Sequence, residues 1–255
     1  MDTTTAIEIA GLRKAFGRTH ALDGLDLRVD AGSVHGFLGP NGAGKSTCIN
    51  LLSGDLAPTS GRVLLGGRDI TRLASHQRSR IGIGRSFQRT NVFPGFTAFE
   101  NCRLAAQAKS QYPFDWWTRA AHCHESSHRA ERAIEQAGLA GQTQRLAGTL
   151  SHGQKRQLEI AMCLATGPHV LLLDEPLAGM GPEETERMLL LLSTLKPAHA
   201  ILLVEHDMDA VFRIADHITV MVNGGVIASG DPDAIRVNAD VQAAYLGESE
   251  AVATA

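Results

Sequence analysis

A glycine-rich stretch decides how this sequence folds. It consists of Gly39-Pro40-Asn41-Gly42-Ala43-Gly44-Lys45-Ser46-Thr47, between the apolar run Val34–Leu38 and a helical pattern over residues 46–52. Glycines allow backbone N–H groups to turn inward around phosphate oxygens, and a following helix adds its positive N-terminal end. The stretch has the form G-x-x-x-x-G-K-[ST] between a strand and a helix, which is the context that a phosphate-binding loop requires.

Two residues of this loop would carry most of its chemistry. Lys45 is expected to reach the β- and γ-phosphates of a nucleotide, and the Ser46 hydroxyl is expected to bind Mg²⁺. The alternative is a glycine-rich turn that merely precedes a helix. The strand and the helix on either side favour the phosphate-binding loop.

The rest of the chain largely alternates between short apolar runs and helical patterns. Apolar runs of this length are typical of parallel strands that are buried on both faces. Strand and helix in alternation indicate an α/β domain with a parallel sheet. The runs are residues 34–38, 170–173, 200–204 and 218–222, and the helical patterns are residues 46–52, 157–165, 182–195 and 208–215.

Some regions depart from this alternation. Residues 7–12 and 21–29 have strand patterns with no helix between them, which predicts an antiparallel subsheet. From about residue 88 to 149 the strand patterns disappear, and Ala130, Ala133 and Ile134 recur at helical spacing. We expect a core of residues 1–87 and 150–236, an inserted helical subdomain of residues 88–149, and a C-terminal helix and tail of residues 237–255.

The composition is that of an ordinary globular protein. Of the 255 residues, 44% are hydrophobic and 20% are charged, and the net charge is -3. Such a chain can bury a large core, and it lacks the bulk positive charge of many nucleic-acid-binding proteins. The four cysteines form no C-x-x-C pair, which favours a reducing compartment over a disulfide scaffold. Neither a secretory signal nor an apolar run of the ~20 residues that span a bilayer is recognisable, so we expect no membrane crossing.

Two adjacent carboxylates follow the apolar run over residues 170–173. In open α/β sheets, ligands bind at the carboxyl ends of the strands. Asp174 is therefore expected to hold Mg²⁺, and Glu175 to face the γ-phosphate and orient a water molecule. An acidic pair at the end of a strand is often only solvent-exposed polarity, but a phosphate-binding loop nearby favours a catalytic site.

Five motifs in this order resemble those of the ATPase subunits of ATP-binding cassette (ABC) transporters, over about residues 7–248. The phosphate-binding loop and the acidic pair are two of them. The other three are Ser86-Phe87-Gln88, Leu150-Ser151-His152-Gly153-Gln154 and Leu203-Val204-Glu205-His206-Asp207. Five motifs in order are far more specific than any one of them. The resemblance implies a P-loop NTPase (RecA-like) fold, ATP and Mg²⁺ as cofactors, and ATP hydrolysis as the activity.

The resemblance also implies a role for each motif. Gln88 would join the shell of Mg²⁺ and the attacking water, and His206 would contact the γ-phosphate, or else only cap the next helix. Phe16 matches the aromatic residue that stacks on adenine, although a lone Phe beside a β-subsheet is usually a core residue. The implied catalytic residues are Glu175, His206 and Gln88, and the implied Mg²⁺ ligands are Ser46, Gln88 and Asp174. The implied ATP-binding residues are Phe16, Gly39, Pro40, Asn41, Gly42, Ala43, Gly44, Lys45, Ser46, Thr47, Ser151, Gly153 and Gln154, the last three from a second cassette.

Two positions depart from the family pattern. His152 stands where glycine is commonest in the signature motif, and Gly181 stands where many members carry an aspartate that crosses the dimer interface. Ser151, Gly153 and Gln154 are retained. Communication between two cassettes is therefore expected to differ from the usual scheme, whereas hydrolysis need not be lost.

The finer resemblance is to uptake cassettes for branched-chain and other hydrophobic amino acids, with urea and amide importers close behind. It rests on residues 88–94, 151–160, 205–208 and 244–248. It implies a second ATP-binding subunit, identical or homologous, and two membrane-spanning permease subunits. An extracytoplasmic solute-binding protein would act indirectly, and no nucleic acid is expected. The location implied is cytoplasmic, on the inner face of the cell membrane.

Three other interpretations compete. His124-Glu125-Ser126-Ser127-His128 fits the zinc motif H-E-x-x-H, but no third ligand is evident, and we interpret it as a solvated helix face. Trp116 and Trp117 indicate either packing within the insertion or a docking surface. Family members outside transport commonly carry two cassettes or a long coiled coil, and this chain has one phosphate-binding loop and no sustained heptads.

Overall fold

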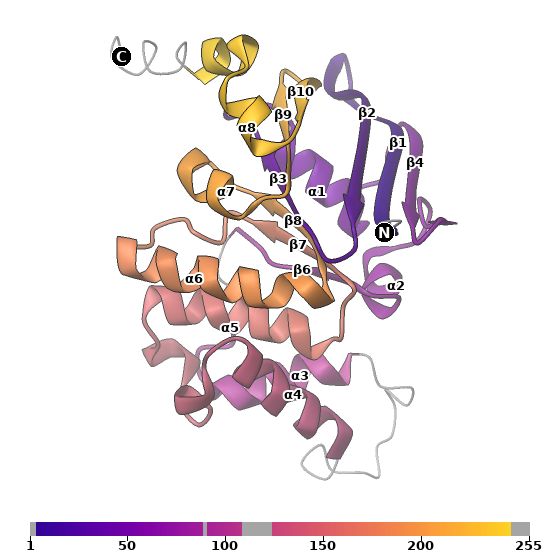
Figure 1. Cartoon of the computed structure of the whole chain (residues 1–255). Coiled ribbons are helices and arrows are strands. Elements are labelled where there is room, and N and C mark those ends of the chain that lie inside the picture. Colours follow the sequence, from indigo (N-terminus) through magenta and orange to yellow (C-terminus); the bar gives the residue numbers. More distant parts are fainter. Residues whose placement is uncertain (1–3, 89–90, 109–123, 246–255) are drawn as a thin grey trace.

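Two β-sheets organise the described residues, which are 4–88, 91–108 and 124–245 of this computed structural model (Figure 1). The first sheet has the strand order β2-β1-β4-β5 and is antiparallel. Its strands are β1 (Thr5–Phe16), β2 (Thr19–Asp30), β4 (Ser60–Leu65) and β5 (Arg68–Asp69). The predicted antiparallel subsheet is confirmed, and β4 and β5 extend it beyond the prediction.

The second sheet forms the core and has the order β10-β9-β3-β8-β7-β6. Its strands from β9 to β6 run parallel, and β10 pairs with β9 in the antiparallel sense. They are β3 (Val34–Leu38), β6 (Ile83–Arg85), β7 (Val170–Asp174), β8 (Ala200–Val204), β9 (His217–Val222) and β10 (Gly225–Gly230). The α/β fold class is confirmed, because the four apolar runs predicted as buried parallel strands form β3, β7, β8 and β9 of this sheet.

The two faces of the core sheet are covered by different hydrophobic clusters. In β7, Leu171 and Leu173 pack into one cluster, whereas Val170 and Leu172 pack into the other. Successive side chains of a strand point to opposite faces, so a strand buried on both sides must be apolar throughout. The continuous apolar runs in the sequence follow from this burial.

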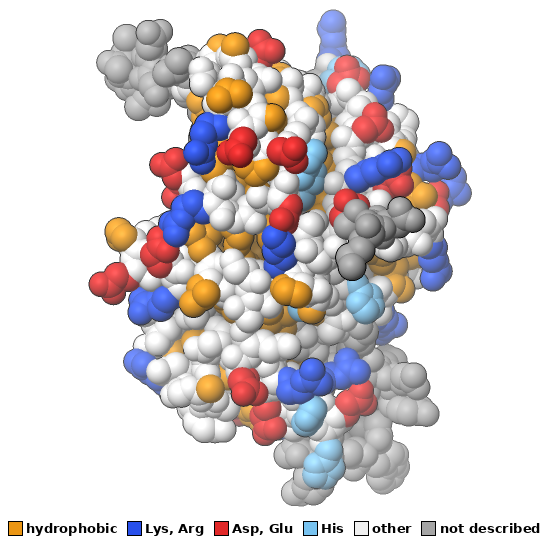
Figure 2. Space-filling model, in the orientation of Figure 1, with side chains coloured by type: hydrophobic (Ala, Val, Ile, Leu, Met, Phe, Trp, Pro, Cys, Tyr) orange, Lys and Arg blue, Asp and Glu red, His pale blue; other side chains and the backbone are white. Residues whose placement is uncertain are grey.

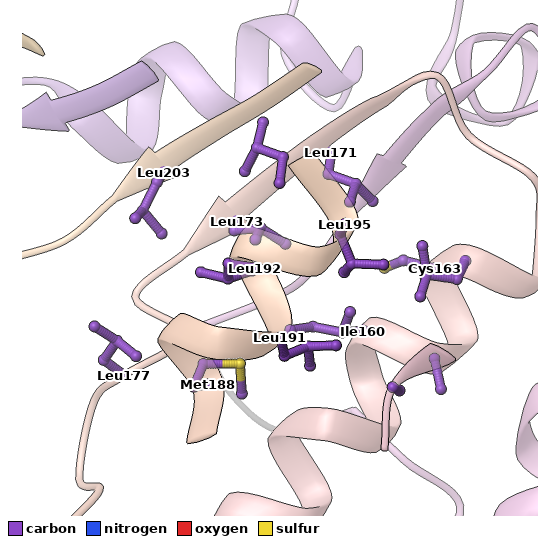
Figure 3. Packing of buried hydrophobic residues seen from close by; sticks show 14 of the residues in the cluster. Ile160, Cys163, Leu171, Leu173, Leu177, Met188, Leu191, Leu192, Leu195 and Leu203 are labelled. Atoms are coloured by element: carbon purple, nitrogen blue, oxygen red, sulfur yellow. The ribbon is translucent and has the colours of Figure 1, made fainter. Parts of the chain in front are cut away.

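Helices cover both faces of the core sheet. Buried residues of α1 (Lys45–Ser53) lie in the cluster shared with the antiparallel sheet. On the other face, α5 (His152–Ala165) and α6 (Pro182–Leu195) pack through Ile160, Leu191, Leu192 and neighbouring residues against Leu171 and Leu173 (Figure 3). The remaining helices are α2 (Ser75–Arg80), α3 (Ala98–Gln107), α4 (His124–Gln136), α7 (Met208–Ile214) and α8 (Pro232–Arg236).

Helices α3 and α4 lie in the region where an insertion is expected. They pack with α5 in one cluster, below the core sheet in Figure 1. The helical face predicted from Ala130, Ala133 and Ile134 is buried, as is Ala137. Trp116 and Trp117 lie outside the described residues.

Two helices differ from the sequence prediction in extent. Helix α5 begins at His152 rather than Gln157, because Ser151 and Gln154 form a capping box: the Ser151 hydroxyl accepts from the Gln154 N–H, and the Gln154 side chain accepts from the Ser151 N–H. The C-terminal helix expected from residue 237 is a helical stretch over residues 239–245, and the short helix α8, which was not expected, precedes it.

The surface carries charges of both signs. On the face in Figure 2, acidic and basic side chains alternate over short distances. Such a face lacks the extended positive field that steers nucleic acids to a protein.

Helix α6 offers a matched test of this packing. Leu192 is fully buried, whereas Leu190, two residues earlier, is 69% exposed. Leu192→Ala should lower the free energy of unfolding by about 2–5 kcal/mol, because it leaves a cavity under the sheet. Leu190→Ala should change it by about 0.5 kcal/mol or less. Urea denaturation of the two variants checks this expectation, and equal losses would contradict it.

Candidate functional site

The phosphate-binding loop connects the end of β3 to the start of α1. A Cβ atom on Gly39 would lie 2.2 Å from the Met221 carbonyl oxygen, and one on Gly44 would lie 2.5 Å from that of Ala21. Glycine is therefore required at both positions. Within the described residues, no side chain caps α1 at Gly44. The N-terminal N–H groups of the helix can then bind an anion.

Lys45 holds its charge within this loop. Its side chain is buried, and its ammonium donates hydrogen bonds to the carbonyl oxygens of Gly39 and Pro40, the latter at 3.0 Å. Ser46 and Asn41 are exposed, Thr47 is partly buried, and Ala43 is buried. The loop thus presents a cation and backbone donors, the groups that bind phosphates.

Asp174 ends β7 as a buried carboxylate. Its Oδ2 lies 3.8 Å from Arg85 Nη2, and its Oδ1 has no hydrogen-bond partner among the described residues. Burial raises the pKa of this carboxyl, although Arg85 opposes the shift. A buried acceptor without a partner is costly, and a divalent cation would supply the missing partner. The Asp174 site therefore fits Mg²⁺.

Glu175 is the centre of a hydrogen-bonded cluster with Gln88 and His206. Gln88 Nε2 donates to Glu175 Oε2 at 3.0 Å, and His206 Nε2 contacts Glu175 Oε1. Glu175 also has a φ of 52°, which costs a residue with a side chain about 1–3 kcal/mol and is found most often at functional sites. The three predicted catalytic residues are thus in direct contact, although they lie far apart in the sequence.

The signature residues form a separate group at the start of α5. Ser151 Oγ lies 3.3 Å from Glu184 Oε1, and Ser151, Gly153 and Gln154 line a cavity of about 260 Å³. The lining of that cavity comes from residues 138–157 and 180–188, so the phosphate-binding loop contributes nothing to it. The two groups of predicted ATP-binding residues therefore do not share this cavity within one chain.

The two departures from the family pattern lie on neighbouring segments. His152 Nε2 donates to the carbonyl oxygen of Ala178 at 3.0 Å, and a Cβ on Gly179 would lie 3.2 Å from the same nitrogen. Gly181 is the residue just before α6, where Pro182 occupies the first turn. The His152 side chain thus links the signature motif to the loop after Glu175.

Phe16 ends β1 with half of its surface exposed, which excludes the core position. The Lys14 ammonium lies 5.0 Å from the centre of its ring. The next strand, β2, contributes Ala21 and Leu22 to the surroundings of Gly44. An aromatic face at this end of the sheet could stack on a nucleotide base.

Sequence reasoning missed Glu205, the residue before His206. Its side chain is buried, with Oε1 accepting from the Leu177 N–H at 2.7 Å and Oε2 from the His206 N–H at 3.3 Å. A signal existed, because Glu205 follows the apolar strand β8 just as Glu175 follows β7. Glu205 holds the loop after Glu175 close to the loop of His206.

The H-E-x-x-H motif lies at the start of α4. His124 and His128 are exposed, and Glu125 pairs with Arg129 at 2.7 Å. In the described part of the chain, no group of three or more His, Cys, Asp or Glu residues could hold a metal ion. Within the described residues, the two histidines therefore lack the third ligand that a zinc site requires.

The chain is similar to known proteins over most of its length. The family model described as ABC transporter matches residues 22–178, and the model described as Branched-chain amino acid ATP-binding cassette transporter matches residues 226–251. The High-affinity branched-chain amino acid transport ATP-binding protein BraF of Pseudomonas aeruginosa is 40% identical over 95% of this chain and 98% of its own length. LivG of Escherichia coli K12, with the same description, is 37% identical over the same shares.

Solved structures give the same result. The ADP conformation of MJ1267, an ATP-binding cassette of an ABC transporter, is 31% identical with a TM-score of 0.85 over 96% of this chain and 100% of that chain. The dimeric structure of the bacterial ABC transporter cassette MJ0796 is 26% identical with a TM-score of 0.75 over 89% of this chain and 98% of that chain. Sequence and structure therefore agree that this chain belongs to the ABC transporter family, as one of its ATP-binding and ATP-hydrolysing subunits.

Proposed function

We propose that this chain powers the uptake of branched-chain amino acids by hydrolysing ATP. The observation that supports the solute is the match, over nearly the whole chain, to BraF and LivG, proteins described as branched-chain amino acid transport ATP-binding proteins. The match of residues 226–251 to a branched-chain amino acid cassette model points the same way. The chemical step is supported by the cluster at Glu175.

In this proposal, Glu175 orients the attacking water and accepts its proton. A carboxylate held at both oxygens has a fixed direction, and Gln88 and His206 provide those two contacts. His206 also stabilises charge that develops on the γ-phosphate, and Lys45 and the loop N–H groups hold the phosphates. Phe16 stacks on adenine.

Mg²⁺ would be held by Ser46, Asp174 and Gln88. The orphaned Oδ1 of Asp174 is the feature that supports this assignment. When bound, Mg²⁺ neutralises negative charge on the phosphates. The chain's part is to present oxygen ligands, which Mg²⁺ prefers.

Two chains, or this chain and a homologous cassette, would form the complete site. Ser151, Gly153 and Gln154 of one subunit would cap ATP on the phosphate-binding loop of the other, and two-fold symmetry would make two equivalent sites. The phosphate-binding loop of the same chain contributes nothing to the cavity that the signature residues line, which supports this arrangement, as does the dimeric structure of the related cassette MJ0796.

The dimer would act beneath two membrane-spanning permease subunits on the inner face of the cell membrane, without nucleic acid. None of the helices in the described ranges combines the length and apolar character that a bilayer crossing requires. In this proposal, the permeases supply the path for the solute, and a solute-binding protein outside the cell delivers it.

Glu205 would position two segments of this site without touching the phosphates. Burial raises the pKa of its carboxyl from the ordinary 4.5 to about 7, although the hydrogen bonds from the Leu177 and His206 N–H groups oppose the shift. The folded protein therefore keeps this proton over a pH range in which the unfolded chain loses it. The stability that the protonated Glu205 carboxyl contributes is present below pH 4.5 and is lost as the pH rises through about 7.

Glu175→Gln tests the catalytic assignment and the shared site. Hydrolysis should fall by about 10²- to 10⁴-fold, because the amide cannot act as a base, while ATP binding is kept. The trapped ATP should hold two cassettes together in size-exclusion chromatography with MgATP, alone or with the partner cassette. Lys45→Ala is the control that should abolish ATP binding. Hydrolysis at the wild-type rate, or a monomer in every mixture, would show that the assignment is wrong.

Deletion of the gene tests the solute. Uptake of labelled leucine, isoleucine and valine should fall, and urea uptake should persist. The wild-type gene should restore uptake, and the Glu175→Gln gene should not, because transport depends on hydrolysis. Normal uptake of all three amino acids with loss of an unrelated solute would overturn the proposed substrate.

Glu205→Gln tests the buried carboxyl, because the amide keeps an acceptor for Leu177 but does not titrate. The Tm of the wild type minus the Tm of this variant should decrease as the pH rises from about 5 to 8, since only the wild type acquires a buried charge. Glu125→Gln, at an exposed site on α4, is the matched control and should show little change in this difference. A Tm difference for Glu205→Gln that stays constant or grows with pH would rule out the shifted carboxyl.

A further inference from the structure

A buried ion pair lies on α5, in the turns that follow the signature motif. Arg156 Nη1 donates to Glu159 Oε2 at 2.9 Å, and the side chains are only 6% and 5% exposed. The sequence analysis gave neither residue a role. Charges of this kind are rarely buried unless their hydrogen bonds hold something in place.

The pair contacts the backbone of the segment that carries Gln88. Arg156 donates from Nη1 to the Phe87 carbonyl oxygen at 2.9 Å and from Nη2 to the Gln88 carbonyl oxygen at 2.6 Å. Glu159 Oε1 accepts from the Asn91 N–H at 2.7 Å. Arg156 thus binds carbonyls that precede positions 89 and 90 in the sequence, and Glu159 binds an N–H that follows them.

These contacts leave little freedom for the backbone at Gln88. The planar guanidinium bridges two successive carbonyls and the carboxylate of Glu159, a geometry that a lysine ammonium cannot reproduce. Arg156 donates only to carbonyl and carboxylate oxygens, and Glu159 accepts from the Asn91 N–H. The two side chains therefore cannot exchange places. Burial raises the pKa of Glu159, and Arg156 and the Asn91 N–H favour its charged form.

We propose that Arg156 and Glu159 are positioning residues, which fix the Gln88 amide against Glu175 and tie it to helix α5. The chain of contacts is continuous, because Gln88 Nε2 donates to Glu175 Oε2 at 3.0 Å and α5 begins at the signature residues. This inference rests on the proposed role of Glu175. It implies that a displacement of α5 changes the geometry of the catalytic carboxylate through Gln88.

The test is a double-mutant cycle between Arg156→Lys and Gln88→Ala on the purified protein, with its partner cassette where hydrolysis requires one. Arg156→Lys should lower kcat by roughly 10- to 100-fold, the scale of misplacing a catalytic group, with KM for ATP within about twofold of the wild type. In the Gln88→Ala background, the same substitution should lower kcat by less than about threefold, because the group that it positions is gone.

Arg78→Lys is the matched control for lost stability. Arg78 is also buried and donates to backbone carbonyls, those of Leu51 and Leu52 at 2.6 and 2.9 Å and those of Thr71 and Leu73, and none of these carbonyls belongs to the segment that carries Gln88. Both Arg→Lys variants should lower Tm, and only Arg156→Lys should lower kcat at temperatures where each variant is folded. Should Arg156→Lys fail to fold, Glu159→Gln enters the same cycle, because its amide places a donor against Arg156 while keeping an acceptor for Asn91.

The outcomes separate this inference from the proposed function. An equal loss of kcat with and without Gln88, or an unchanged kcat in Arg156→Lys, would overturn the positioning role. Wild-type hydrolysis by Glu175→Gln would instead overturn the catalytic assignment, whatever the cycle shows. Coupling of Arg156 to Gln88 with KM unchanged supports the inference.

Discussion

The parallel pairing of β3, β8 and β7 is the constraint on which the site depends. Phe37 of β3 pairs with Val204 of β8, and Val204 pairs with Asp174 of β7, so the three strands end at one level. Parallel strands place their carboxyl ends at the same edge, where open α/β sheets bind ligands. The phosphate-binding loop, the acidic pair and the Glu205-His206 pair therefore leave the sheet side by side. A shift of one strand by one residue would separate them.

Buried titratable side chains then hold in place the loops that the sheet edge brings together. Asp174, Glu205 and the pair Arg156–Glu159 all lie in the interior, where an unpartnered charge is costly. Their polar atoms, apart from Asp174 Oδ1 and Arg156 Nε, have partners in backbone groups or opposite charges near the site. Because each of these interactions is lost when its geometry changes, the loops at this edge are held in defined positions. Asp174 Oδ1, which has no hydrogen-bond partner, is the place where a metal ion would supply one.

The predictions from the sequence were best where a local pattern carried the information. The apolar runs predicted β3, β7, β8 and β9, because strands buried on both faces must be apolar throughout. They missed β6, which has three residues, and β10, in which no residue is fully buried. Among the site residues, Glu205 was missed beside His206, and Arg156 with Glu159 had the spacing of an ordinary ion pair on an exposed helix face.

Local properties of the sequence were enough to predict the phosphate-binding loop, the acidic pair and the α/β fold class; these properties are glycine spacing, strand-end carboxylates and hydrophobic periodicity. The tertiary structure instead brings Gln88, Glu175 and His206 into one cluster, since the residues in its two contacts are 87 and 31 positions apart in the chain. It also decided that His152 contacts Ala178 and that Arg156 holds the Gln88 carbonyl. Such contacts depend on how helices and loops pack over the sheet, and no local pattern of residues specifies that packing.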